Sequence, residues 1–390
     1  MFHQRCYYSI PLALVLALGH WSSAPIHSAL AVEHLLVAVD GLQQKLSGKV
    51  VVEDSAGSML LETDEGAMWP ISAETILRRS SDSAAMVPLD QAQMSARLLQ
   101  EMGPGFQRHE TTHYVIVHNT TRVYARWCGK LLERLQKGFL AFWKKQGCKV
   151  HEPKSPLAVL VFKNKASYIK HARAELGPSA GNAIGYYSFQ TNRIVMYDLT
   201  GSQALRREDT RRGKLKDITA LLQHSDAKPL VATIIHEATH QIAFNCGLQS
   251  RYADNPVWLS EGMAVYFETP DLSSKRLWSG TNKVNESRWD RFRNNVRRGK
   301  AANLKTLIAD DNRLRHPKTA VDGYAEAWAW NYFLIKWHAK EYAQYLEALA
   351  AKPLLVKDDR ATRLTDFQEH FGENLQELEA EFYRRMSKLR

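Results

Sequence analysis

The residues best suited to chemistry lie in an apolar segment at residues 231–246, which reads VATIIHEATHQIAFNC. Its hydrophobic residues occur on most faces of a helix, and this pattern predicts a buried helix. His236 and His240 are four positions apart, so their imidazoles lie on one helical face about one turn apart and are able to converge on one cation. Glu237 lies about 100° further round the helix, where it could hold a water beside the cation.

The alternative reading of this segment is two hydrogen-bonded core histidines and a buried glutamate. We favour a metal site because each unpaired ionisable group costs several kcal/mol to bury, and three of them occur within five residues. A bound metal offsets that cost. The H-E-x-x-H pattern on a helix is also the zinc-binding pattern of metallopeptidases, with the glutamate as general base.

A third ligand is predicted in the next apolar segment, PVWLSEGMAVYFE at residues 256–268. Asn255 followed by Pro256 is a typical helix start, with Asn255 as the expected N-cap. Glu261 lies in this helix, and Gly262 would let the helix pack closely against a neighbour. Two histidines and one glutamate make a three-ligand zinc site with a fourth position open for water. Glu268 shares a face with Glu261, and either orients a ligand or is a solvated surface residue.

The two segments, HEATH and WLSEGMA, resemble those of the gluzincin metallopeptidases of the peptidase MA type. HEATHQ followed by P-x-W-L-S-E-G-M-A-x-Y-F-E is most similar to the bacterial domain of unknown function 1570 family. The resemblance covers about residues 105–390. It implies a zincin-like fold, one Zn²⁺ per chain bound by His236, His240 and Glu261, and hydrolysis of peptide bonds with Glu237 as general base.

The same resemblance suggests Tyr324 as a catalytic residue. In the aminopeptidase branch a tyrosine about sixty residues beyond the glutamate ligand stabilises the oxyanion, and Tyr324 follows Glu261 by 63 positions in the sequence GYAEA. Its alternative role is that of an ordinary aromatic residue at a helix start. Two departures from related families are clear. Val265 stands where thermolysin-like enzymes carry an acid, and no G-x-M-E-N motif precedes the zinc helix, so aminopeptidase specificity is not implied.

The length and composition are those of a folded protein that carries excess positive charge. The chain has 390 residues, 52 Lys and Arg against 41 Asp and Glu, and a net charge of +11. Two basic runs lie at residues 206–216 and 288–298, and each is either a solvated face or a surface for anionic material. Basic residues are otherwise interleaved with acids, so we expect no nucleic-acid partner. The expected partners are a peptide or protein substrate and an anionic cell-envelope surface.

The first residues have the pattern of a signal peptide, expected at residues 1–31. Arg5 supplies the positive charge, IPLALVLAL at residues 10–18 is the apolar region, and Ala29-Leu30-Ala31 is the cleavage motif. An uncleaved membrane anchor is the alternative. The chain is therefore expected to be exported. Of its cysteines, Cys128, Cys148 and Cys246 follow this segment, and we expect all three to be buried thiols, although a bridge to Cys246 is the other option.

Periodicity along the chain predicts an α+β protein. Residues 32–80 are expected to form a small β-rich domain. It begins with a helix at 32–46 and continues as a meander or barrel with strands at 49–53, 58–63 and 67–71. Residues 81–104 are a linker and a helix. The metallopeptidase domain spans 105–390, with an α+β part at 105–229 and a helical part at 230–390. The strand at 193–197 is a candidate edge for binding an extended peptide.

Two functions follow from these patterns. The first is a secreted zinc metallopeptidase. The alternative is a catalytically inactive zincin-like protein that binds the cell envelope. The presence of Glu237 favours the first, because a structural zinc site needs no general base and is closed by four protein ligands.

Overall fold

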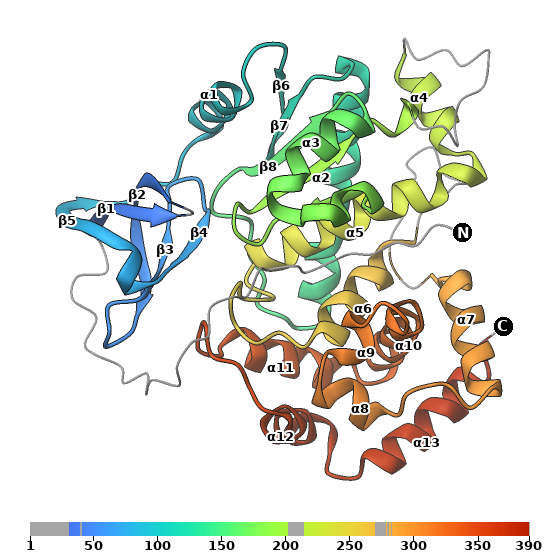
Figure 1. The fold of residues 1–390 in the computed structure, drawn as a ribbon. Coiled ribbons are helices and arrows are strands. Elements are labelled where there is room, and N and C mark those ends of the chain that lie inside the picture. The colour runs from blue at the N-terminus through green and yellow to red at the C-terminus, as the bar shows by residue number, and fades with distance from the viewer. Residues whose placement is uncertain are drawn as a thin grey trace.

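The structure is a computed structural model that describes residues 31–39, 41–201, 214–269, 278, 281 and 283–389 (Figure 1). Apart from Ala31, the expected signal peptide lies outside these residues, as do four of the basic residues at 206–212. Within the described part, no helix combines the length and the apolar character needed to cross a membrane.

The first sheet contains five antiparallel strands in the order β4-β3-β2-β1-β5. Their bounds are β1 Ala31–Val39, β2 Leu42–Glu53, β3 Met59–Glu62, β4 Met68–Ile71 and β5 Ile76–Ala85. The expected helix at 32–46 is therefore wrong, since this segment is the hairpin β1–β2. The Asp-Gly sequence at 40–41 is a strong hairpin turn signal, and Gly41 adopts a φ of +77°. The start of the expected linker and helix at 81–104 is also strand, since β5 extends to Ala85.

This sheet has a small core of its own and is tied to the rest of the chain by polar contacts. The core consists of Leu35, Val37, Leu46, Met59, Leu61 and Ile71. The buried Arg193 guanidinium pairs with Glu65, in the β3–β4 turn, at 2.7 Å and with Glu101 at 2.7 Å. In the same region, Arg251 donates to the Gly66 carbonyl at 2.7 Å.

The second sheet has the order β6-β7-β8-β10-β9. Strands β7 (Tyr114–His118), β8 (Leu157–Phe162) and β10 (Arg193–Tyr197) are parallel and buried, and the edge strands β6 (Gln107–Glu110) and β9 (Gly185–Tyr187) are antiparallel to their neighbours. The strand predicted at 193–197 is present as β10. The proposed peptide-binding edge at 193–197 is wrong, however, because β10 pairs on both sides and β9 is the edge strand.

Helices flank this sheet and form most of the remaining chain (Figure 1). The first six α-helices of the described residues are α1 Gln91–Met102, α2 Arg122–Lys145, α3 Lys165–Leu176, α4 Leu215–Leu222, α5 Lys228–Asn245 and α6 Val257–Phe267. The last seven are α7 Glu286–Arg297, α8 Leu304–Ala309, α9 Asn312–Arg315, α10 Ala320–Trp337, α11 Ala339–Ala350, α12 Arg360–Phe371 and α13 Leu375–Met386. The predicted α+β class is confirmed.

The three cysteines of the described residues are buried thiols, as expected. Burial raises the pKa of Cys148 and of Cys246 to about 12, so neither is a reactive thiolate at neutral pH.

Candidate metal centre

Helix α5 carries His236, Glu237 and His240 through the interior of the protein. Pro229 lies in its first turn, and every residue from Leu230 to Phe244 is buried. The helix packs against α2, α6 and the strands β9 and β10. The apolar sequence accounts for this burial, because a helix that is hydrophobic on most faces must be covered on all of them.

Helix α6 brings Glu261 to α5. Its first amide, the Val257 N–H, donates to the Asp311 carboxylate at 3.0 Å. The expected N-cap role of Asn255 is therefore wrong, since its side-chain amide donates instead to the Ser250 and Ala253 carbonyls. The cap comes from a residue 54 positions away along the chain, which no local pattern could indicate.

Gly262 allows α6 to approach α10 closely. A Cβ atom at this position would lie 1.9 Å from Asn331 Nδ2 and 2.5 Å from the Ala327 carbonyl oxygen. Any larger residue would push the two helices apart or displace Asn331, which donates to the Trp258 and Ala327 carbonyls. The glycine therefore sets the depth at which the neighbouring Glu261 enters the core.

His236, His240 and Glu261 converge on one point. His236 Nε2 lies 3.2 Å from His240 Nε2 and 3.1 Å from Glu261 Oε2, and His240 Nε2 lies 3.6 Å from Glu261 Oε1. One ligand atom from each residue falls within 4.8 Å of the others. Sequence spacing places the histidines together on α5, and the packing of α6 supplies the carboxylate.

The environment of these atoms fits a bound cation. Glu261 is fully buried, and its Oε1 atom has no hydrogen-bond partner among the described residues. Burial on its own would raise the pKa of the Glu261 carboxyl, but the His240 and His236 imidazoles lower it by more, so this pKa lies well below its ordinary value. A buried carboxylate oxygen without a donor is costly, and a metal ion would satisfy it.

Glu268 supports the site from behind His236. Its carboxylate is buried, and Oε2 lies 2.9 Å from His236 Nδ1, on the opposite side of the ring from the other ligands. Asn285 donates to Oε1 at 3.3 Å, and the Arg288 guanidinium lies 3.6 Å from the same oxygen. Of the two roles considered for Glu268, that of a solvated surface residue is wrong, because the side chain is buried. The carboxylate lies where it would orient the His236 ring toward a bound metal.

Replacement of Glu268 by Ala is expected to weaken zinc binding by roughly 10–100-fold, because the His236 ring loses the acceptor that holds its orientation. The measurement is a competitive zinc titration against a chelating dye. Glu373→Ala, at an exposed glutamate, is the matched control and should bind zinc as the parent does. Equal affinity of both variants would show that Glu268 does not support the site.

Glu237 is buried beside the three ligands, not among them. Its Oε2 accepts a hydrogen bond from the Tyr187 N–H at 2.9 Å. Tyr187 is the last residue of β9 and pairs with Ile194 of β10. Since its N–H points to Glu237, the outer edge of β9 faces α5. This contact could not be predicted from the sequence, because a backbone donor leaves no signal in residue type.

Tyr324 lies on the first turns of α10 and is buried. The Arg288 guanidinium stands 5.7 Å from the centroid of its ring, and the same guanidinium approaches Glu268. Tyr324 is thus linked through Arg288 to the carboxylate behind His236. The basic run on α7 is therefore not a uniformly solvated face. Arg288 points inward and Arg291 pairs with Asp322 at 2.6 Å.

Comparison with known families supports part of this picture. Residues 230–355 match the model of the family described as "Protein of unknown function (DUF1570)". This range contains α6, α10 and all of α5 except its first two residues. A search of the curated proteins finds no match.

Proposed function

We propose that this chain is a zinc-dependent metallopeptidase. The observation that carries the proposal is the convergence of His236, His240 and Glu261 with the buried Glu237 beside them. Two imidazole nitrogens and one carboxylate suit zinc, whereas calcium and magnesium prefer oxygen ligands. Three protein ligands leave a fourth position for water, as in catalytic zinc sites.

Zinc bound by these residues would supply Lewis acidity, which lowers the pKa of water and polarises a substrate carbonyl. Glu237 is placed to accept the proton of the attacking water and to deliver it to the leaving amine nitrogen. The Tyr187 N–H fixes the position of its Oε2 atom. Glu268 would keep the His236 ring in the orientation that presents Nε2 to a bound cation.

An extended peptide would bind along β9. Only one side of this strand pairs with β10, and its other side faces Glu237. Addition of a strand to such an edge gives main-chain hydrogen bonds that do not depend on side-chain identity. The substrate would then cross the metal centre in an extended conformation.

Tyr324 is the proposed donor to the oxyanion. Its replacement by Phe is expected to lower kcat by roughly 10²–10³-fold, the usual effect of removing one such donor, and to leave zinc affinity unchanged. Because the aromatic ring is kept, its contact with Arg288 is kept too. The measurements are initial rates and the zinc titration described above. A rate equal to that of the parent would remove Tyr324 from the reaction.

The test of the proposed function is hydrolysis of an unfolded protein, fluorescein-labelled casein, by the chain from residue 32 purified with zinc. Cleavage that stops with a chelator and returns with zinc is the expected result. A chain that holds zinc but cleaves no unfolded protein or peptide library would instead support a non-catalytic envelope-binding protein.

A further inference from the structure

The exposed side of α2 carries segregated positive charge. Seven residues of this helix are exposed, and six of them are basic: Arg122, Arg126, Lys130, Lys137, Lys144 and Lys145, with Ala141 as the seventh. Exposed helix faces commonly mix charges of both signs at positions i and i+4, where opposite charges stabilise and like charges repel. Repulsion between the like charges on this face therefore destabilises α2.

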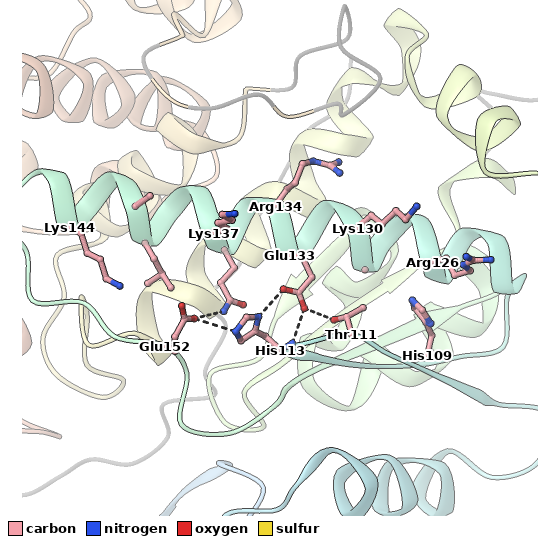
Figure 2. Close-up of a pocket in the computed structure, with 14 residues that line it drawn as sticks. His109, Thr111, His113, Arg126, Lys130, Glu133, Arg134, Lys137, Lys144 and Glu152 are labelled. Atoms are coloured by element: carbon pink, nitrogen blue, oxygen red, sulfur yellow. Dashed lines mark hydrogen bonds and ion pairs between the residues drawn. The ribbon is translucent and has the colours of Figure 1, made fainter.

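The basic residues form a stripe along the helix. At about 100° per residue, Arg126, Lys130, Lys137 and Lys144 fall within about 40° of one another, and at about 1.5 Å per residue they span about 27 Å. Figure 2 shows these side chains following one another along α2. Among the described residues none of the four forms an ion pair, so their charges are available to a ligand.

The stripe borders a groove of about 770 Å³. Its second wall is the turn between β6 and β7, which lies against α2 at Gly129, where a Cβ atom would come within 2.7 Å of Thr111 Cγ2. Glu133 ties the two walls together. Its carboxylate accepts from Thr111 Oγ1 at 2.6 Å and from the His113 N–H at 2.8 Å.

The two acids of the groove are engaged by their neighbours. Besides those two bonds, Glu133 lies 2.8 Å from His113 Nδ1. Glu152 accepts from Gln136 at 3.0 Å and lies 3.4 Å from His113 Nε2 (Figure 2). These carboxylates therefore point to the imidazole and the turn, and the lysines keep a net positive field over the groove.

The side chains that line the groove suit some classes of anion better than others. It contains no Phe, Tyr or Trp, the side chains on which single-stranded nucleic acids stack their bases. Its only aliphatic residues are Leu140 and Ala141, too few to anchor a peptide in apolar pockets. It does offer the imidazole of His109 as a hydrogen-bonding group next to the row of basic side chains. We propose that this groove binds a linear anionic polysaccharide.

The experiment measures binding of size-defined heparin to the full chain at several salt concentrations. K130Q/K137Q/K144Q should weaken binding by about tenfold or more near physiological salt, and the slope of log K against log salt should be smaller by about two. K305Q/K340Q/K388Q changes three exposed lysines elsewhere and should bind as the parent does. Casein cleavage is not involved, so failure of the proposed peptidase function would leave this result unaffected.

Three outcomes would overturn the proposal. Equal weakening by both triple variants would mean that heparin responds to net charge alone. Tighter binding of an oligothymidine of equal charge would indicate a nucleic-acid surface, and tighter binding of polyglutamate would indicate an acidic polypeptide. Circular dichroism of the variants checks that α2 remains helical, which is expected because all three lysines are exposed.

Discussion

Replacement of Glu237 by Gln is expected to abolish most hydrolysis while zinc stays bound. The amide has the shape of the carboxylate, and its oxygen still accepts from the Tyr187 N–H, so the helix and the three ligands keep their places. It cannot take up the proton of the attacking water, and loss of a general base commonly costs about 10²–10⁴-fold in rate. Initial rates on labelled casein and metal content by elemental mass spectrometry are the two measurements.

The Glu237→Gln result separates three roles. Lost activity with full zinc content supports the general base. Loss of zinc would mean that Glu237 is itself a ligand, which its place outside the ligand cluster contradicts. A parental rate would assign proton transfer to another group. Glu373→Gln, at an exposed site, controls for the removal of one negative charge.

Replacement of His240 by Ala is expected to remove the metal, from about one zinc per chain to nearly none, since two ligands cannot hold a catalytic zinc tightly. Activity should disappear with it. A readout independent of activity is thermal unfolding, because a ligand that binds only the folded state stabilises it. Added zinc should raise the Tm of the parent and leave that of the variant unchanged.

His316→Ala, at an exposed histidine, is the matched control for His240→Ala. It should retain zinc and its stabilising effect. If His240→Ala bound zinc as the parent does, the three side chains would not form the site. If neither parent nor variant bound zinc, the convergence of these residues would be only a buried hydrogen-bonded cluster.

The loop that leads into α6 is secured by a buried ion-pair network. Arg363 of α12 donates to Asp254 at 2.8 Å and to Asp311 at 2.9 Å, and Asp311 also accepts from the first amide of α6. Burial on its own would raise the pKa of the Asp254 carboxyl, but the contacts with Arg363 and Lys357 lower it by more. Its pKa therefore lies below the ordinary value, and the carboxyl stays charged. The C-terminal helices therefore help to position Glu261, although they contribute no ligand.

Local patterns predicted much of the fold. The strands β3, β4 and β10, the helices α1, α5 and α6, and the α+β class all follow from periodicity that is visible within ten to twenty residues. For the hairpin β1–β2 the pattern predicts a helix instead, because Leu35, Leu42 and Leu46 also fit a helical spacing. In the structure Leu42 is 75% exposed, and the turn at Gly41 overrides that spacing.

The sequence by itself determined the candidate chemistry of this protein. Two histidines one turn apart share a face of any helix they occupy, so their pairing needs no tertiary information. Only the tertiary structure decided how Glu261 reaches them, which oxygen it leaves without a donor, and that Glu268 lies behind His236. The same holds for β9 as the edge strand, for Asp311 as the cap of α6 and for the groove along α2. Each of these depends on contacts between segments far apart in the chain, and residue type and spacing do not encode such contacts.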